Sequence, residues 1–324
     1  MLGGYKMKKW LVLCLAVFFL ISSGFAGGKN EKKFQVELFG GYTTLNPEDL
    51  NSRPNTHEQG IQFWNDDYYA FSVKNGYIKS FSTEQSGGFK TIDNAVPFGF
   101  RLKYSLSKSL SLSFGIKYLS RSAASYAKYE YSIIERNGLE STYMADWKPL
   151  KISAKGFTPL LGVHFEKVLS KAVGLEIYIT GGPLFSRIRL GIDREAESTY
   201  DGTVLEHDIW EVDERGKGIG YAIDGGIRLN IEIGKNIALF VEGGYAYQVV
   251  NRLSGPGYEN RNGVVNEWEG DWGMKEYYFD RYWGTIDLSV ASNYWEDGDD
   301  YLWVKGFSLD LSGFQARVGI SYRF

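Results

Sequence analysis

The sequence contains little of three residue types on which disulfides, metal sites and many catalytic sites depend. Its 324 residues include one cysteine, three histidines and seven prolines. The single cysteine, Cys14, cannot form an intramolecular disulfide and excludes a metal site built from several cysteines. Scarce proline, together with 39 glycines and 16% aromatic residues, favours an all-β chain over a helical one.

Neither a strong net charge nor a long apolar run is present after the N-terminal region. The formal net charge is −3, so the basic surface typical of nucleic-acid-binding proteins is not expected. No later stretch reaches the roughly 18 consecutive apolar residues that predict a transmembrane helix. No pattern in the sequence predicts a cofactor, and we expect none.

The N-terminal region has the pattern of a secretory signal. The basic stretch Met7–Lys9 precedes the apolar run Trp10–Ile21, and small residues follow as far as Ala26. This order of basic, apolar and small residues is typical of a cleaved signal peptide. We therefore predict a signal peptide at residues 1–26, which removes Cys14 from the mature chain.

Eight later segments alternate apolar and polar residues with period two, which predicts strands with one apolar face. In the first segment, Val36 and Leu38 share the apolar face, and Glu37 lies on the opposite face. The eight segments begin at Phe34, Val96, Leu110, Leu161, Val173, Ile219, Ile237 and Phe314. Each predicted strand has about 9–11 residues, which is the length that a tilted strand needs to cross a bilayer.

The connections between these segments alternate between short and long. Short turns lie at residues 105–108, 167–172 and 232–236, and the longer connections lie near residues 45–95, 120–156, 185–217 and 250–306. This alternation is typical of outer-membrane barrels. We predict that residues 27–324 form an all-β domain, an eight-stranded antiparallel up-and-down transmembrane β-barrel with long extracellular loops. A soluble β-sandwich is the alternative, but it does not explain the alternation of loop lengths.

Aromatic residues gather at both ends of the predicted strands, on the apolar face. Such belts are expected where amphipathic rings lie at headgroup depth. The predicted outer belt contains Tyr42, Tyr118, Tyr221, Tyr245 and Tyr247, and the inner belt contains Phe34, Tyr104, Phe165, Tyr322 and Phe324.

The last eleven residues, Phe314–Phe324, alternate apolar and polar side chains and end in phenylalanine. This segment resembles the C-terminal insertion signal of outer-membrane β-barrels, and the whole chain resembles the small eight-stranded outer-membrane proteins of the A, X and W types. The resemblance implies that Tyr322 and Phe324 are read by the barrel-assembly machinery. It also implies a bacterial outer-membrane location with periplasmic termini, extracellular loops, and outer-membrane lipid and lipopolysaccharide as partners. We expect a monomer.

The inward-facing positions of the predicted strands carry equal numbers of acidic and basic side chains. They are Glu37, Arg101, Lys103, Lys117, Glu166, Glu176, Asp224, Arg228, Glu242 and Arg317. An eight-stranded barrel is only wide enough inside for side chains, so these charges are expected to pair and plug the lumen. A narrow channel for small ions, lined by the same charges, is the alternative.

Candidate sites for catalysis or metal binding are weak. His164 is predicted to face the lumen near its periplasmic end, and His57 and His207 are predicted to lie in loops. A hydrolase would need one of them beside a nucleophile, so we expect no enzyme and keep a hydrolase as the less favoured alternative. The acidic run Glu296–Asp300 lacks the spacing of a calcium loop, and we expect no metal ion.

The long connections contain all eight tryptophans of the mature chain and three turn signals, Asn75-Gly76, Asn137-Gly138 and Asp201-Gly202. We expect the strands to continue above the membrane as a folded rim with a small tryptophan core; a recognition surface is the alternative. A hairpin of Tyr68–Val73 and Tyr77–Phe81 would add two strands to the wall, but its limbs are too short to span a bilayer.

These observations predict an integral outer-membrane barrel with a largely plugged lumen and a structural or surface-interaction role through its extracellular loops. A narrow porin-like channel and an outer-membrane hydrolase are the two alternative functions.

Overall fold

The computed structural model describes residues 34–47, 51, 70–76, 78–279, 283–291, 301–306 and 308–324. The predicted signal peptide, residues 1–26, lies outside them. Strands make up most of the described chain, and α3 (Ala70–Lys74) is a short helix of five residues. Within these ranges, no helix has the length and apolar character that crossing a membrane requires.

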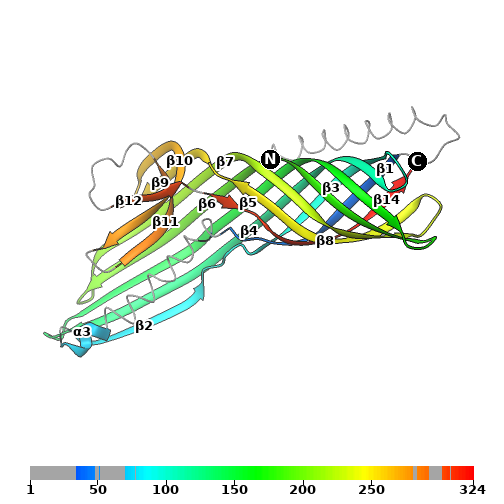
Figure 1. The fold of residues 1–324 in the computed structure, drawn as a ribbon. Coiled ribbons are helices and arrows are strands. Elements are labelled where there is room, and N and C mark those ends of the chain that lie inside the picture. The colour runs from blue at the N-terminus through cyan, green and yellow to red at the C-terminus, as the bar shows by residue number, and fades with distance from the viewer. Residues whose placement is uncertain are drawn as a thin grey trace.

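Eight strands form a closed barrel (Figure 1). They are β1 (Phe34–Thr44), β3 (Asn94–Ser105), β4 (Leu110–Glu135), β5 (Glu140–Val168), β6 (Val173–Tyr200), β7 (Thr203–Glu232), β8 (Ile237–Val250) and β14 (Gly313–Arg323). Each strand pairs antiparallel with the next in this order, and β14 pairs with β1 to complete the ring. The predicted fold class, an eight-stranded antiparallel barrel, is therefore confirmed.

The strands of this barrel are staggered. A row of paired residues that starts at Phe34 of β1 passes round the wall to Phe314 of β14. The amide of Phe314 donates a hydrogen bond of 2.9 Å to the Thr44 hydroxyl, so the row returns to β1 ten residues beyond Phe34. Such stagger tilts the strands and leaves an interior that side chains can fill.

The wall of the barrel has apolar side chains outside and charged side chains inside. Leu161 and Val318 face outward with 67% and 60% of their surface exposed, whereas Glu37 and Arg228 are fully buried within the barrel. This arrangement is the reverse of that in a water-soluble protein, and it suits a wall surrounded by hydrocarbon.

Two of the long connections consist mostly of strand, in agreement with the predicted continuation of the barrel strands into a folded rim. β4, β5, β6 and β7 have 26, 29, 28 and 30 residues and run far beyond the barrel, to the lower left in Figure 1. The period-two alternation continues into this extension with its polarity reversed, and a bulge in β5 between Trp147 and Leu150 interrupts it once. In β6, Ile188 and Leu190 are buried on the inward face, and Arg187 and Arg189 are exposed on the outward face.

We call this extension the rim: residues 121–135, 140–155, 187–200 and 203–217 of β4–β7, with the strands that pair with them. β2 (Ile78–Gly88) pairs with β4, and β9 (Ser254–Arg261) pairs with β7 and with β10 (Val264–Phe279). β11 (Trp283–Ala291) and β12 (Tyr301–Gly306) pair with β10, and β13 (Leu309–Asp310) pairs with β8.

Two of the three predicted hairpin turns are confirmed. Asn137-Gly138 joins β4 to β5 and Asp201-Gly202 joins β6 to β7, with φ values of 85° at Gly138 and 73° at Gly202. Asn75-Gly76 instead joins the helix α3 to β2, so the predicted strand Tyr68–Val73 is wrong where the structure describes it. The barrel wall has eight strands, and this segment adds none to it.

The inward face of the rim carries an apolar core. Leu150, Ile152 and Leu190 are buried there, and Trp210 and Trp268 pack against the same cluster with part of their surface exposed. Those two tryptophans thus contribute to a rim core, as predicted, while Trp64 and Trp295 lie outside the described residues.

Candidate functional site

The strand register places opposite charges side by side along the lumen wall. Glu176 of β6 is paired with Arg228 of β7, Arg228 with Glu242 of β8, and Glu242 with Arg317 of β14. The side chains of Arg317 and Glu242 form an ion pair. These four residues make a row of alternating charge across four neighbouring strands.

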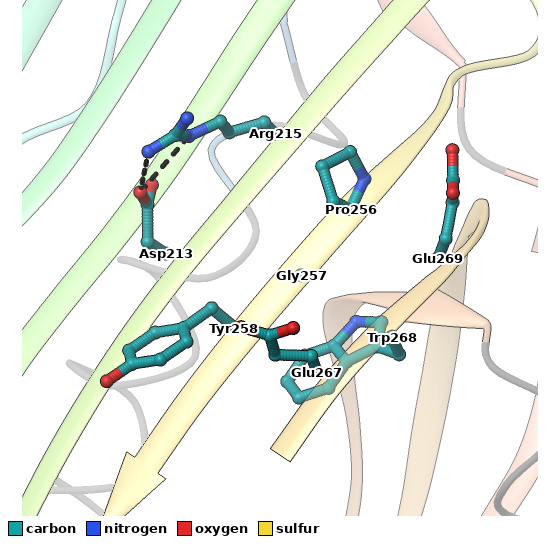
Figure 2. Close-up of a pocket in the computed structure, with 8 residues that line it drawn as sticks. All are labelled: Asp213, Arg215, Pro256, Gly257, Tyr258, Glu267, Trp268 and Glu269. Carbon is teal, nitrogen blue, oxygen red and sulfur yellow. Dashed lines mark hydrogen bonds and ion pairs between the residues drawn. The ribbon is translucent and has the colours of Figure 1, made fainter. Parts of the chain in front are cut away.

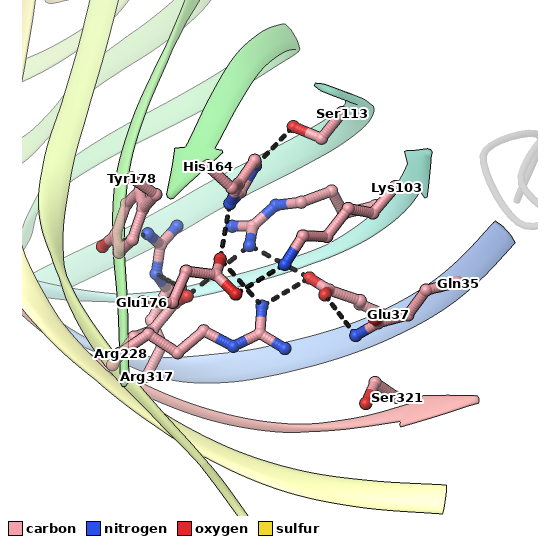
Figure 3. A network of polar contacts seen from close by, with 12 residues as sticks. Gln35, Glu37, Lys103, Ser113, His164, Glu176, Tyr178, Arg228, Arg317 and Ser321 are labelled. Atoms are coloured by element: carbon pink, nitrogen blue, oxygen red, sulfur yellow. Dashed lines mark hydrogen bonds and ion pairs between the residues drawn. The ribbon is translucent and has the colours of Figure 1, made fainter. Parts of the chain in front are cut away.

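Further ion pairs cross the lumen from wall to wall (Figure 3). Arg228 Nη1 donates to Glu37 Oε2 at 2.7 Å and connects β7 with β1. Lys103 Nζ on β3 lies 2.5 Å from Glu176 Oε2 on β6, and Lys117 Nζ on β4 lies 2.6 Å from Asp224 Oδ2 on β7. These bonds run across the lumen and connect strands that are not neighbours in the wall.

Nine of the ten predicted lumen charges are at most 2% exposed: Glu37, Arg101, Lys103, Lys117, Glu176, Asp224, Arg228, Glu242 and Arg317. Glu166 differs, with 19% of its side chain exposed, and it lies 3.7 Å from Arg323 Nη2 at the turn end of the barrel. Asn230 connects Glu166 to the rest, because its amide nitrogen lies 3.3 Å from Glu166 and 3.1 Å from Glu176.

Three aromatic side chains in the lumen are not among the predicted site residues. Phe240 lies under the Arg228 guanidinium at 3.6 Å, and Phe39 lies under Arg101 and Arg317 at 5.2 and 5.0 Å. Tyr178 accepts a hydrogen bond of 2.9 Å from Arg317 Nη2. Stacked guanidinium groups on aromatic rings gain cation–π attraction where water is excluded. All three could have been found from the sequence, because each is an aromatic residue at a position that faces the same side as the polar residues of its strand.

Glycines make room for all three of these rings, and a Cβ at Gly99 would lie 2.4 Å from the Phe39 ring. A Cβ at Gly226 would lie 2.7 Å from the Tyr178 hydroxyl, and one at Gly319 would lie 2.3 Å from the Phe240 ring. Larger residues at any of these positions would displace the rings that support the arginines.

Ser113, His164 and Glu176 form a hydrogen-bonded chain inside the barrel. His164 Nε2 lies 2.7 Å from Ser113 Oγ, and His164 Nδ1 lies 2.6 Å from Glu176 Oε1. A serine, a histidine and a carboxylate in this order can activate a nucleophile. Here, however, Glu176 also binds Lys103, and Ser113 is 7% exposed while His164 and Glu176 are 0% exposed. The chain is therefore part of the buried network, with its serine closed to a substrate.

Of the other candidate catalytic and metal-binding residues, His207 is the one that lies within the described ranges. His207 is exposed on the outward face of the rim, with Nε2 3.3 Å from Glu195 and Nδ1 3.8 Å from Glu197. His57 and the acidic run Glu296–Asp300 lie outside the described residues. In the described part of the chain, no group of three or more His, Cys, Asp or Glu side chains is arranged to hold a metal ion.

The predicted aromatic belts lie on the outward face, at both ends of the barrel. Near the short turns, the Phe34 and Tyr104 rings lie 4.9 Å apart, and so do the rings of Tyr322 and Phe324. Near the rim, contacts join Phe98 to Tyr118, Tyr221 to Tyr247, Tyr245 to Phe314 and Phe157 to Phe185. Tyr42 and Phe165 are exposed on the same outward face.

The predicted assembly signal lies at the seam of the barrel. Tyr322 of β14 is paired with Val36 of β1 and Ile237 of β8, and the Phe324 amide donates to the Phe34 carbonyl at 2.9 Å. The last residues of the chain therefore take part in closing the ring.

The outward face of the rim has a hollow of about 560 Å³ between β7, β9 and β10 (Figure 2). Its lining residues are Asp213, Arg215, Pro256, Gly257, Tyr258, Glu267, Trp268 and Glu269. Burial opposes ionisation of Asp213, but hydrogen bonds from Arg189 and Arg215 outweigh it and hold the pKa of this carboxyl below its usual range. With Glu267 and Glu269 beside the ion-paired Asp213, the hollow suits a cationic group better than an anion.

Comparisons with known proteins give similarity in structure only. No protein-family model and no curated protein matches the sequence. A major outer membrane protein of Thermus thermophilus is similar at a TM-score of 0.36 and 11% identity, over 91% of this chain and 100% of that one. OprG of Pseudomonas aeruginosa is similar at 0.33 and 10%, over 91% and 98%, and the Escherichia coli outer membrane protease OmpT at 0.33 and 9%, over 93% and 99%. All three are outer-membrane proteins.

Proposed function

We propose that this chain is an integral protein of a bacterial outer membrane whose barrel is closed to solutes and whose rim is its functional part. The membrane location is supported by the apolar outward face and by the closure of the ring, which leaves the barrel wall without an unpaired strand edge. The aromatic rings at both ends of the barrel fit the two interfaces of a bilayer.

The ion-pair network across the lumen is the observation that supports a barrel closed to solutes. Ion pairs between opposite walls, with side chains at most 2% exposed, leave the barrel axis occupied. Breaking one buried pair by removing a partner costs about 3–5 kcal/mol, so spontaneous opening of several pairs is rare.

The rim supports a surface-interaction role. It extends the barrel on one side by stable, paired strands with their own core, which is more structure than a mere connection between strands requires. We propose that the rim is extracellular and the termini periplasmic. The assembly signal of Tyr322 and Phe324 and the monomeric state stay predictions.

Single-channel recording in planar bilayers tests the closed lumen. We expect no discrete conductance from the wild-type protein. A quadruple variant, Glu37→Ser, Lys103→Ser, Glu176→Ser and Arg228→Ser, removes two acids and two bases from the barrel axis and is expected to give discrete steps.

The matched control removes the same charges from the exposed rim, by Lys128→Ser, Glu130→Ser, Lys148→Ser and Glu195→Ser, and is expected to stay silent. Heat-modifiable gel mobility shows that each variant has folded. Discrete conductance from the wild-type protein at ordinary voltages would overturn the closed lumen and favour the narrow channel.

A further inference from the structure

The outward face of the rim carries six exposed cations on three neighbouring strands. They are Lys151 and Lys155 of β5, Arg187 and Arg189 of β6, and Arg215 and Lys217 of β7. Lys155 is paired with Arg187 and Arg187 with Lys217, and the next row joins Arg189 to Arg215. We call these six residues the basic patch.

The basic patch begins where the apolar wall ends. Phe157, Phe185 and Ile219 form one row of paired residues across β5, β6 and β7, and all three are exposed on the outward face. The row of Lys155, Arg187 and Lys217 comes two residues further along each strand, on the same face. Two residues of a strand span roughly 6–7 Å. This is about the distance between the edge of the hydrocarbon and the phosphate groups of the lipid headgroups.

The patch keeps most of its positive charge. Among the residues that the structure describes, Asp213 forms ion pairs with Arg189 and Arg215, at 2.6 and 2.5 Å, and the other four cations have no carboxylate within ion-pair distance. On β10, two strands beyond, the outward residues Glu267 and Glu269 are acidic and limit the patch on that side.

Two described strands on the other side of the barrel, β1 and β3, lack such cations at the same level. The outward residues that follow the aromatic belt are Thr44 on β1 and Val96 and Asn94 on β3, none of which is charged. A ring of cations all round the barrel would suit general attraction to an anionic surface, whereas a patch on three strands suits a bound headgroup.

We propose that the basic patch binds a phosphate-bearing lipid headgroup of the outer leaflet, such as the bisphosphorylated glycolipid part of lipopolysaccharide. Arginine guanidinium groups bind phosphate oxygens in a bidentate manner, and lysine adds a compact charge. The acyl chains of such a lipid would lie against Phe157, Phe185 and Ile219 directly below the patch. This inference rests on the membrane position and orientation given under the proposed function.

Binding of fluorescent bisphosphorylated lipid A to the purified protein in a nonionic detergent tests the proposal. The test variant is Lys155→Gln, Arg187→Gln and Lys217→Gln. Since each cation near an anionic lipid surface contributes on the order of 1 kcal/mol, we expect the affinity to fall about tenfold or more. The control variant is Lys108→Gln, Lys171→Gln and Lys235→Gln, which removes the same charge from exposed turns at the other end and is expected to bind within about twofold of wild type.

Three further arms identify what the patch recognises. A charge-retaining variant, Lys155→Arg, Arg187→Lys and Lys217→Arg, is expected to bind lipid A within a few-fold of wild type. Lipid A without phosphates is expected to bind as weakly to wild type as the phosphorylated form binds to the test variant. Inorganic phosphate at millimolar concentration is expected to leave the bound lipid in place.

Equal affinity of the test variant and wild type for lipid A would overturn the proposal, and so would equal binding of the lipid without phosphates. Displacement of the lipid by inorganic phosphate would show an adventitious anion site only. The proposed function fails by a different result, conductance of the wild-type barrel, which leaves the lipid measurement interpretable.

Discussion

At the scale of single residues, the lumen shows how charged side chains can be buried at tolerable cost. Glu37 accepts hydrogen bonds from Gln35 at 2.8 Å, Arg101 at 3.0 Å and Arg228 at 2.7 Å. A buried carboxylate is stable when its lone pairs are satisfied in this way, and the arginines depend equally on the carboxylate. The network is consequently sensitive to the loss of any one member.

Glu37→Ala is expected to destabilise the barrel by about 3–5 kcal/mol, because it leaves Arg101 and Arg228 buried without their shared partner. The measurement is the free energy of unfolding in urea, with the protein folded in detergent micelles or lipid.

Glu232→Ala removes an acid that is paired with Arg323 and 42% exposed at a turn, and it serves as the matched control. Its expected cost is below about 1 kcal/mol. If both substitutions cost the same, the lumen network does not contribute to stability as the structure indicates.

The inward position of most charged residues could be predicted from the sequence, because side chains alternate strictly along a strand. Which charge meets which across the lumen could not be predicted. The pairing of Lys103 with Glu176 and of Lys117 with Asp224 depends on the stagger of ten residues round the wall, which only the complete register defines. The Ser113–His164–Glu176 chain was missed for the same reason.

At the scale of elements, the long strands are explained by a change of surroundings along their length. Within the barrel wall, Leu161 and Ile177 face outward, whereas in the rim Ile152 and Leu190 face inward. A strand that passes from hydrocarbon into water must have its apolar side chains on the inward face instead of the outward face. In β6 this change occurs while the side chains go on alternating. The sequence therefore predicts that strands continue into a rim, but the length of this continuation could not be predicted, because its apolar face is opposite to that of the membrane-spanning segments.

Asp208 connects strands within the rim. Its carboxylate accepts hydrogen bonds from Arg194 Nη2 at 2.6 Å, Arg261 Nε at 2.8 Å and Asn262 Nδ2 at 3.1 Å, and thereby joins β6, β7 and the turn after β9. Burial opposes its ionisation, but the hydrogen bonds from Arg261 and Arg194 outweigh burial and keep its pKa below the ordinary value.

A carboxyl whose pKa is lowered by folding stabilises the fold above its ordinary pKa of about 3.9, and the contribution is lost as the pH falls through the lowered value. We expect hydrogen-exchange protection of residues 203–214, corrected for intrinsic rates, to fall in wild type below about pH 4. Asp208→Asn is expected to lower protection already at pH 7, by about 1–3 kcal/mol, and to remove most of the pH dependence.

The control for this experiment is Asp201→Asn, at the exposed hairpin tip, where asparagine tolerates the positive φ of 46°. Unchanged protection of residues 203–214 in Asp208→Asn would show that these hydrogen bonds do not stabilise the rim.

At the scale of the whole molecule, the proposed orientation follows from placing the short turns in the periplasm and the rim outside. The only cysteine of the chain lies in the predicted signal peptide, so single-cysteine variants of the mature protein report on one site each. Val204→Cys lies near the far tip of the rim, and Lys171→Cys lies in a turn at the opposite end; both positions are exposed.

A membrane-impermeant maleimide is expected to label Val204→Cys on intact cells and Lys171→Cys only after the outer membrane is permeabilised. The reverse pattern of labelling would place the rim in the periplasm and would also remove the basis for lipid binding at the outer leaflet.

The tall wall of β4–β7 stands beside the shorter strands β1, β3, β8 and β14, as Figure 1 shows. The barrel is therefore taller on one side than on the other. A membrane protein that approaches from the side of β4–β7 meets a wall that rises beyond the lipid headgroups. On the side of β1, β3, β8 and β14 the barrel strands end sooner. The direction from which a neighbouring membrane protein approaches therefore determines which surface of the barrel it meets. Rotation of the barrel about its long axis changes which neighbours contact the rim.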